Sequence, residues 1–296
     1  MNSNHSFIGS SVALITPMFT DGSVDYDALN HLIDFHIDSG TSSIISVGTT
    51  GESATVGVKE HLKIIDHSVK YAAKRIPIIA GTGANSTSEA IELTKEAQNL
   101  GADACLLVTP YYNKPTQEGL FQHFKLIAES VNIDQILYNV PGRTAVNMSV
   151  EITVRLAEIS NIIGIKDATG DLSVIRQLVE KCPKDFLLLT GDDATAVDFL
   201  LAGGHGGISV TANIAPKELQ KVYLAAIAGN LELAQSLNSQ LVNLHKNLFL
   251  ESNPIPVKWA LHRMGKCDEG IRLPLLALSE EFHAIIIQDL EKLGLI

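Results

Sequence analysis

The feature that most constrains the fold of this chain is a regular alternation of short apolar segments with amphipathic helical segments. The alternation repeats about eight times within about 230 residues, and each apolar segment ends at a turn. This rhythm predicts a (β/α)8 barrel, the TIM barrel, because an open doubly wound sheet usually has fewer strands before the domain changes. The expected strands are 12–15, 43–47, 77–80, 104–108, 135–138, a run ending at Lys166, 187–189 and 207–210.

Helical periodicity fills most of the intervals between these strands. The expected helices are 25–39, 59–73, 86–101, 116–130, 149–159 and 216–228. Residues 230–296 lack convincing strands and show helical runs over 233–248, 256–264 and 275–293. We therefore expect a catalytic barrel over residues 1–229 and a helical domain over 230–296. The second should pack on the first, because no low-complexity linker separates them.

Composition narrows the class of protein. The formal net charge of -11 argues against a nucleic-acid partner or an anionic membrane partner. Residues 1–11 show no signal peptide, and no apolar stretch approaches the length of a membrane span. The three cysteines are scattered and the histidines show no zinc spacing. We expect a cytoplasmic protein without a metal site of its own.

Lys166 is the most unusual residue of the expected strands. It stands at the end of an apolar run, 162–165, and is followed by a turn that contains glycine and threonine. An ammonium beside an apolar wall loses hydration, which favours the neutral amine, and a neutral amine can form a Schiff base with a carbonyl compound. The structural alternative is a lysine whose stem packs on apolar neighbours while its ammonium reaches water.

Other residues that a core does not need also follow the expected strands: Thr49, Thr50, Tyr111, Tyr112, Tyr138 and Arg143. In a barrel these positions converge on the carboxyl mouth, where active sites of this fold lie. Hydroxyls and turn N–H groups there can hold a carboxylate, a phenol can relay protons, and a guanidinium can clamp a second carboxylate. Each also has a structural interpretation as a turn hydroxyl, a strand aromatic, a subunit contact or a solvated charge.

Two glycine-rich segments resemble ligand loops. The segment 81–86 follows a strand and opens a helix, as a dinucleotide fingerprint does, but the third glycine is missing and Ser86 suits a helix cap that forms a capping box with Glu89. The segment 203–207 resembles a phosphate loop, but it precedes an expected strand and so belongs to the opposite end of the barrel. We interpret both as structural turns.

Five segments together resemble a known family: 47–53, 109–115, 138–144, 164–170 and 253–258. They are similar to the 4-hydroxy-tetrahydrodipicolinate synthase family, also called dihydrodipicolinate synthase, and the likeness covers essentially the whole chain. The segment around Lys166 alone marks the wider superfamily of pyruvate-dependent aldolases and lyases. The segment 138–144, Tyr-Asn-Val-Pro-Gly-Arg-Thr, points more narrowly to the synthase.

The resemblance implies a Schiff-base condensation of pyruvate with L-aspartate 4-semialdehyde, the first committed step toward diaminopimelate and lysine, without an organic cofactor or a metal. The catalytic residues that it implies are Lys166, Tyr138, Thr50 and Tyr112. In the family the equivalent of Tyr112 reaches in from a neighbouring subunit. The substrate-binding residues that it implies are Thr49, Thr50, Arg143, Gly191 and Ile208.

The resemblance also implies a homotetramer, a dimer of tight dimers, and inhibition by L-lysine. The positions that match the lysine site of inhibited members are Ser53, Ala54, His61, Asn85, Glu89 and Tyr111. The chain departs from some inhibited members at Val58, where they carry histidine.

Three other functions stay open on sequence alone. A sibling lyase or aldolase acting on N-acetylneuraminate or a keto-sugar acid would keep Lys166 and change the second substrate, although Arg143 in its Pro-Gly-Arg-Thr setting disfavours it. The incomplete glycine motif at 81–86 suggests a nicotinamide or flavin oxidoreductase. A non-catalytic amino-acid sensor would keep only the lysine site.

Overall fold

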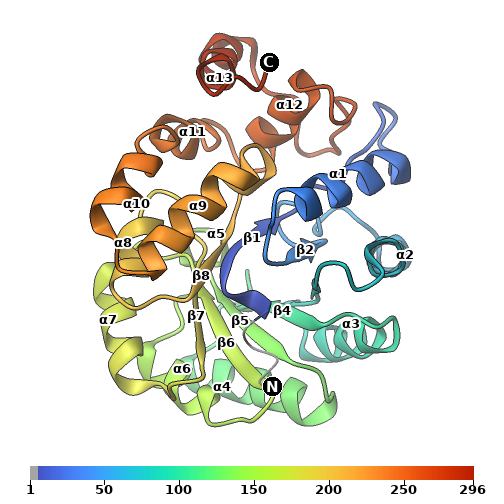
Figure 1. The fold of residues 1–296 in the computed structure, drawn as a ribbon. Coiled ribbons are helices and arrows are strands. Elements are labelled where there is room, and N and C mark those ends of the chain that lie inside the picture. The colour runs from blue at the N-terminus through green and yellow to red at the C-terminus, as the bar shows by residue number, and fades with distance from the viewer. Residues whose placement is uncertain (1–5) are drawn as a thin grey trace.

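The computed structural model describes residues 6–296 and contains a closed barrel of parallel strands in the order β1 to β8 (Figure 1). The strands are β1 Gly9–Ala13, β2 Ile44–Ser46, β3 Ile78–Gly81, β4 Ala104–Val108, β5 Gln135–Asn139, β6 Ile162–Asp167, β7 Leu187–Thr190 and β8 Gly206–Ser209. The predicted TIM barrel is confirmed, and every expected strand overlaps an observed one. Residues 1–5, on which part of the expectation for the N-terminus falls, lie outside the described residues.

A helix or a pair of helices follows each strand, and most of these helices cover the outside of the barrel (Figure 1). They are α1 Tyr26–Asp38, α2 Val58–Ala72, α3 Thr87–Asn99, α4 Gln117–Ser130, α5 Pro141–Thr144, α6 Val150–Ala157, α7 Leu172–Lys181, α8 Ala196–Leu201 and α9 Pro216–Ile227. Asp25, Ser86 and Thr116 begin α1, α3 and α4 by accepting a backbone N–H with their side chains. The predicted role of Ser86 as a helix cap is confirmed.

The C-terminal helices are α10 Leu231–Asn238, α11 Val242–Asn247, α12 Ile255–Arg263 and α13 Glu280–Lys292. The single run expected over 233–248 is wrong, because a turn at 239–241 divides it into two helices. The run expected over 275–293 begins late, because Ser279 is the N-cap of α13. Helices α12 and α13 lie together at one edge of the molecule in Figure 1.

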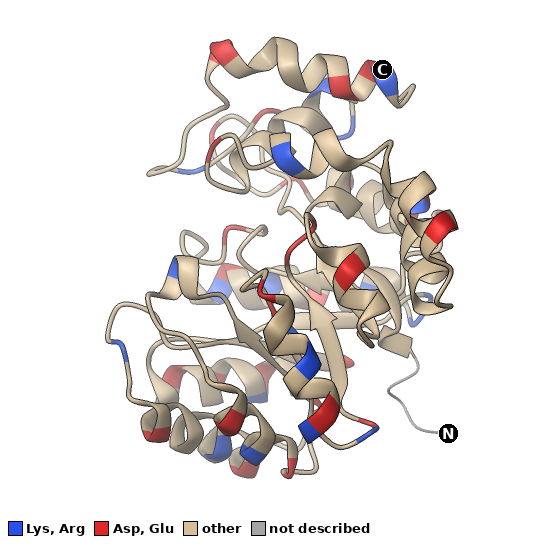
Figure 2. Ribbon diagram, turned by 90° about the vertical axis from the view of Figure 1, so that its left-hand side faces the viewer, with Lys and Arg blue, Asp and Glu red and all other residues tan. Residues whose placement is uncertain are grey.

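Two layers of apolar side chains make up the core. Alternate residues of the strands, among them Ile45, Leu106 and Leu189, fill the barrel interior as one buried cluster. A larger cluster lies between the strands and the helices. Charged residues sit mainly on the helices and loops, with both signs interspersed, while the strands carry few (Figure 2).

The glycine motif after β3 is explained by packing. A Cβ on Gly81 would lie 2.4 Å from the backbone oxygen of Val47, and one on Gly83 would lie 2.3 Å from the backbone nitrogen of Val108. The neighbouring strand ends approach too closely for any side chain at these positions. The glycines therefore serve barrel packing, as the structural interpretation of this segment requires.

The described residues include no helix that is long and apolar enough to cross a membrane. Over residues 6–296 there is also no group of three or more His, Cys, Asp or Glu side chains that could hold a metal ion.

His36 makes the stability of the barrel depend on pH. Burial holds its pKa down from 6.5 to about 3, with Lys266 adding to the effect, and its Nδ1 lies 2.9 Å from the hydroxyl of Thr41. The unfolded chain takes up a proton below about pH 6.5, whereas the folded chain keeps His36 neutral. Stability is therefore lost as pH falls from about 6.5 toward 3.

We expect His36→Gln to reduce the pH slope of the unfolding free energy in this window by up to about 1.4 kcal/mol per pH unit, the value for one proton. Urea unfolding at several pH values measures the slope. His31→Gln, on the exposed side of α1, is the matched control. Equal slopes for wild type and His36→Gln would contradict the assignment.

Candidate active site

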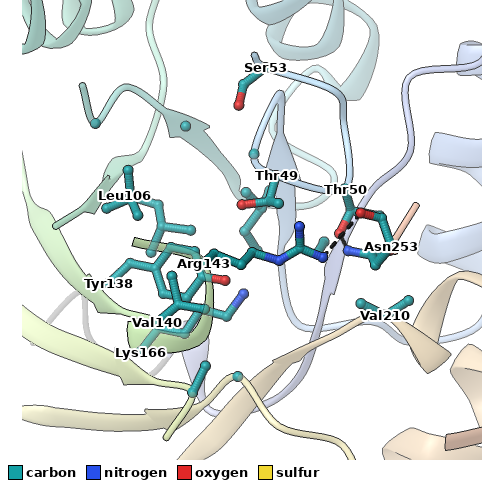
Figure 3. Close-up of a pocket in the computed structure, with 18 of the residues that line it drawn as sticks. Thr49, Thr50, Ser53, Leu106, Tyr138, Val140, Arg143, Lys166, Val210 and Asn253 are labelled. Carbon is teal, nitrogen blue, oxygen red and sulfur yellow. Dashed lines mark hydrogen bonds between the residues drawn. The ribbon is translucent and has the colours of Figure 1, made fainter. Parts of the chain in front are cut away.

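A cavity of about 170 Å³ opens at the carboxyl mouth of the barrel (Figure 3). Its walls come from the residues that end or follow most of the strands. The predicted catalytic and substrate-binding residues that line it are Thr49, Thr50, Tyr138, Arg143, Lys166 and Gly191. The structure thus brings together six positions that are spread over about half of the sequence.

Lys166 and Tyr138 are direct partners across the pairing of β6 with β5. The Lys166 side chain is 5% exposed, and its Nζ lies 4.2 Å from the centre of the Tyr138 ring. The amine is therefore held in a largely apolar wall with a phenol beside it, and it faces a cavity rather than bulk solvent. This placement suits an amine nucleophile with a neighbouring proton carrier.

Gly191 gives the Lys166 side chain its space. A Cβ at position 191 would lie 2.6 Å from Cε of Lys166 and 2.9 Å from Cβ of Ala168. Its backbone N–H donates to the carbonyl of Asp167 at 2.7 Å, which fixes the turn after β7 against the end of β6. The absence of a side chain here lets the amine reach the cavity.

The loop after β2 presents Thr49 and Thr50 to the same cavity. Its backbone is held in the left-handed region at Val47, with φ of 53°, and at Glu52, with φ of 59°. Non-glycine residues rarely adopt this region, and such conformations gather at functional sites. The hydroxyl of Thr50 accepts a hydrogen bond from Nδ2 of Asn253 at 2.9 Å.

Arg143 reaches the mouth from α5, the short helix after β5. The Thr144 hydroxyl donates to the carbonyls of Val140 at 3.1 Å and Val146 at 2.9 Å, which fixes this turn. One Nη of Arg143 donates to the backbone carbonyl of Asn253 at 3.1 Å. In Figure 3 the guanidinium extends from the side of Tyr138 and Lys166 toward Asn253.

Polar contacts fix the ends of β5 and β6 to each other. The Asn139 amide donates to Asp167 at 3.1 Å and to Asn147 at 2.8 Å, and it accepts the N–H of Met148 at 3.0 Å. Because Asn139 and Asp167 directly follow Tyr138 and Lys166, this network fixes the strand ends that carry the phenol and the amine.

Two predicted site residues lie elsewhere. Ile208 is buried in the same interior cluster as Tyr138 and is not among the described residues that line the cavity; Val210 takes that place. Tyr112 is 90% exposed, with φ of 72°, on the loop that follows β4. Its phenol does not line the cavity of its own chain.

A second cavity, of about 250 Å³, adjoins the first and shares Thr49, Ser53 and Arg143 with it. The predicted lysine-site residues that line it are Ser53, Ala54, His61, Glu89 and Tyr111, and Val58 lines it too. Asn85 is not among the lining residues, but its amide donates to the backbone carbonyl of Tyr111 at 3.2 Å.

Burial shifts the pKa of two side chains that line this second cavity, His61 and Tyr111. It lowers the pKa of His61, while the bond from its Nε2 to the carbonyl of Gly81 at 2.7 Å opposes the shift. It raises the pKa of Tyr111, with the carboxylate of Glu89 adding to the effect. At neutral pH the imidazole of His61 and the phenol of Tyr111 are therefore both neutral.

Asn253 and a buried ion pair between Lys258 and Glu52 were not predicted from the sequence. The side chains of the pair are 3% and 1% exposed, and the other Glu52 oxygen accepts the N–H of Arg272 at 3.0 Å. Burial lowers the pKa of Lys258, and Glu52 opposes that shift. The pair joins α12 to the loop that carries Thr50.

Breaking this ion pair should be costly. Lys258→Met leaves the Glu52 carboxylate buried without its cation, and we expect a loss of about 3–5 kcal/mol in unfolding free energy. Glu52→Gln combined with Lys258→Met should recover most of the loss, because no uncompensated charge is left. Urea unfolding measures both variants. A single variant as stable as the double variant would refute a coupled pair.

The fold and the site together define a class: a TIM-barrel protein with a candidate amine nucleophile at its carboxyl mouth. Comparison of the chain with known proteins identifies its family. The model of the dihydrodipicolinate synthetase family matches residues 6–293, and the chain belongs to this family. A curated relative from Ruthia magnifica subsp. Calyptogena magnifica, named 4-hydroxy-tetrahydrodipicolinate synthase, is 64% identical over 100% of both chains.

Solved structures agree with this assignment. A chloride-inhibited dihydrodipicolinate synthase from Acinetobacter baumannii, complexed with pyruvate, has a TM-score of 0.96 at 56% identity over 98% of this chain and 100% of that one. The enzyme from Cyanidioschyzon merolae with lysine bound has a TM-score of 0.96 at 37% identity over 99% and 100%. A monomeric dihydrodipicolinate synthase variant has a TM-score of 0.96 at 40% identity over 99% of both chains.

Proposed function

We propose that this protein is a lyase that condenses pyruvate with L-aspartate 4-semialdehyde to give 4-hydroxy-tetrahydrodipicolinate, the first committed step toward diaminopimelate and lysine. The observation that carries the proposal is the placement of buried Lys166 beside Tyr138 in a cavity that Arg143 also lines (Figure 3). Family membership and the names of the relatives support it. The guanidinium of Arg143 supplies positive charge for an anionic substrate inside an acidic protein.

The first half of the reaction activates pyruvate. The Lys166 amine attacks the ketone, water leaves and a protonated imine forms. The imine draws electrons from the methyl group, so a methyl proton can leave to give an enamine. Tyr138 carries these protons with Thr50 and with Tyr112 of the partner subunit, while the hydroxyls and N–H groups at Thr49 and Thr50 hold the pyruvate carboxylate.

The second half joins the two substrates. The enamine carbon attacks the aldehyde, which forms the carbon–carbon bond and leaves a hydroxyl group. The semialdehyde amine then attacks the imine carbon, which closes the ring and releases the Lys166 amine. Arg143 holds the carboxylate of the semialdehyde at the mouth, and Gly191 leaves the space that Lys166 needs.

Lys166→Ala should consume pyruvate and L-aspartate 4-semialdehyde at least about a thousandfold more slowly than wild type, because the covalent route is removed. Proton NMR of both substrates measures the rates. N-acetylneuraminate is the control substrate, and we expect no cleavage of it. Near-wild-type turnover by Lys166→Ala, or rapid cleavage of N-acetylneuraminate, would reject the proposed reaction.

We also propose that L-lysine binds the second cavity and inhibits the enzyme. Glu89 would pair with an ammonium of the ligand, and Asn85 would bind its carboxylate. A family member with lysine bound supports this, as does the wall that the two cavities share at Thr49, Ser53 and Arg143. Val58 presents an apolar, half-exposed side chain where some inhibited members carry histidine.

L-Lysine at millimolar concentration should lower the rate of wild type. In Glu89→Gln the concentration for half-maximal inhibition should rise about tenfold or more, since a charge-assisted hydrogen bond is lost. Each variant is compared with its own uninhibited rate. L-Norleucine, which lacks the side-chain ammonium, is the control ligand. An unchanged wild-type rate at millimolar L-lysine would count against the inhibitor site.

We propose that the chain acts as a homotetramer built from two tight dimers, in which Tyr112 completes the site of a neighbour. An aromatic side chain that is 90% exposed at the rim of the mouth supports this arrangement.

We further propose that residues 230–296 form a C-terminal helical domain on a barrel of residues 1–229. The free thiols of Cys105, Cys182 and Cys267 fit action in the cytoplasm.

A further inference from the structure

The segment between α11 and α12 reaches from the C-terminal helices into the catalytic mouth. Asn253 and Phe249 on this segment line the cavity, and the Asn253 side chain is buried. Neither residue belongs to a barrel strand or to a loop between two of them. The mouth is therefore completed by a part of the chain that lies about 200 positions beyond Thr50.

Asn253 contacts two groups of the site at once. Its Nδ2 donates to Oγ1 of Thr50 at 2.9 Å, and its backbone carbonyl accepts from Nη2 of Arg143 at 3.1 Å (Figure 3). The first contact depends on the identity of the side chain. The second uses only the backbone and survives a change of side chain at position 253.

The first contact sets the direction of the Thr50 hydroxyl. A hydroxyl has one proton to donate and two lone pairs that accept. Because Oγ1 accepts the N–H of Asn253, the hydroxyl proton is directed away from Asn253. Thr50 lines the cavity, so its proton is available to a group within it.

The stability of the fold alone does not explain an asparagine side chain at position 253. Its Oδ1 is buried without a hydrogen-bond partner among the described residues. A buried carbonyl oxygen without a partner is destabilising, and an apolar side chain of similar shape would avoid that cost. The amide is therefore better explained by the N–H that it gives to Thr50.

We propose that Asn253 is a positioning residue that directs the Thr50 hydroxyl toward the proton relay of the reaction. The inference rests on the proposed function. It assigns to the C-terminal region a part in the removal of the methyl proton of pyruvate. The partial reaction that reports this step is exchange of the pyruvate methyl protons with D2O, which needs no second substrate.

The test compares Asn253→Leu with Asn247→Leu. Asn247, on α11, donates to Asp289 of α13 at 2.6 Å, so its variant removes an amide of the same region away from the site. We expect Asn253→Leu to slow the exchange about tenfold or more, because one member of the relay is misdirected. Asn247→Leu should lower the unfolding temperature and leave the exchange rate unchanged.

Steady-state kinetics give a second readout. The backbone contact to Arg143 persists in Asn253→Leu, so KM for the semialdehyde should change less than about threefold while kcat falls about tenfold. Asn253→Asp keeps the shape but can only accept from Thr50, and it should slow the exchange too. It replaces Asn253→Leu if that variant does not fold.

The outcomes separate the two proposals. Exchange at the wild-type rate in a folded Asn253 variant would overturn the positioning role and leave the proposed reaction intact. Equal slowing in Asn247→Leu would also overturn it, since the effect would then be a general loss of structure. A wild-type protein that exchanges no methyl protons would instead reject the proposed Schiff-base reaction.

Discussion

Closure of the barrel by pairing of β1 with β8 is the constraint on which the site depends. Because every strand runs parallel to its neighbours in a closed ring, all carboxyl ends meet at one mouth. The register then decides which side chains become neighbours, and it places Tyr138 directly beside Lys166. A phenol and an amine separated by 28 positions in sequence thus share one wall, with the amine nitrogen 4.2 Å from the centre of the phenol ring.

Residues from the C-terminal part of the chain support the loop after β2. The loop after β2 has a strained backbone at Val47 and Glu52, and contacts from outside the barrel support it. Lys258 and the Arg272 N–H hold the Glu52 carboxylate, and Asn253 holds Thr50. Strain at a functional loop persists where the surroundings over-determine it, and here the surroundings come largely from residues beyond 250.

Local patterns predicted the barrel and the central residues of the candidate site, because strand ends, helix caps and turns depend on residues that are close together in the sequence. Lys166, Tyr138 and Arg143 were predicted as site residues for that reason. Asn253 and Lys258 received no role, because their contacts span 203 and 206 positions and no local pattern encodes them. The division of 233–248 into two helices was missed, since the apolar periodicity is similar on both sides of the turn.

Capture of a keto acid by one buried amine is the central claim, and reductive trapping tests it most directly. Among the described lysines, Lys166 and Lys258 are buried, but Lys258 is held by Glu52. Treatment with pyruvate and sodium cyanoborohydride, followed by peptide mass mapping, should place one three-carbon adduct on the peptide that contains Lys166. No adduct, or an adduct on another lysine, would contradict the account.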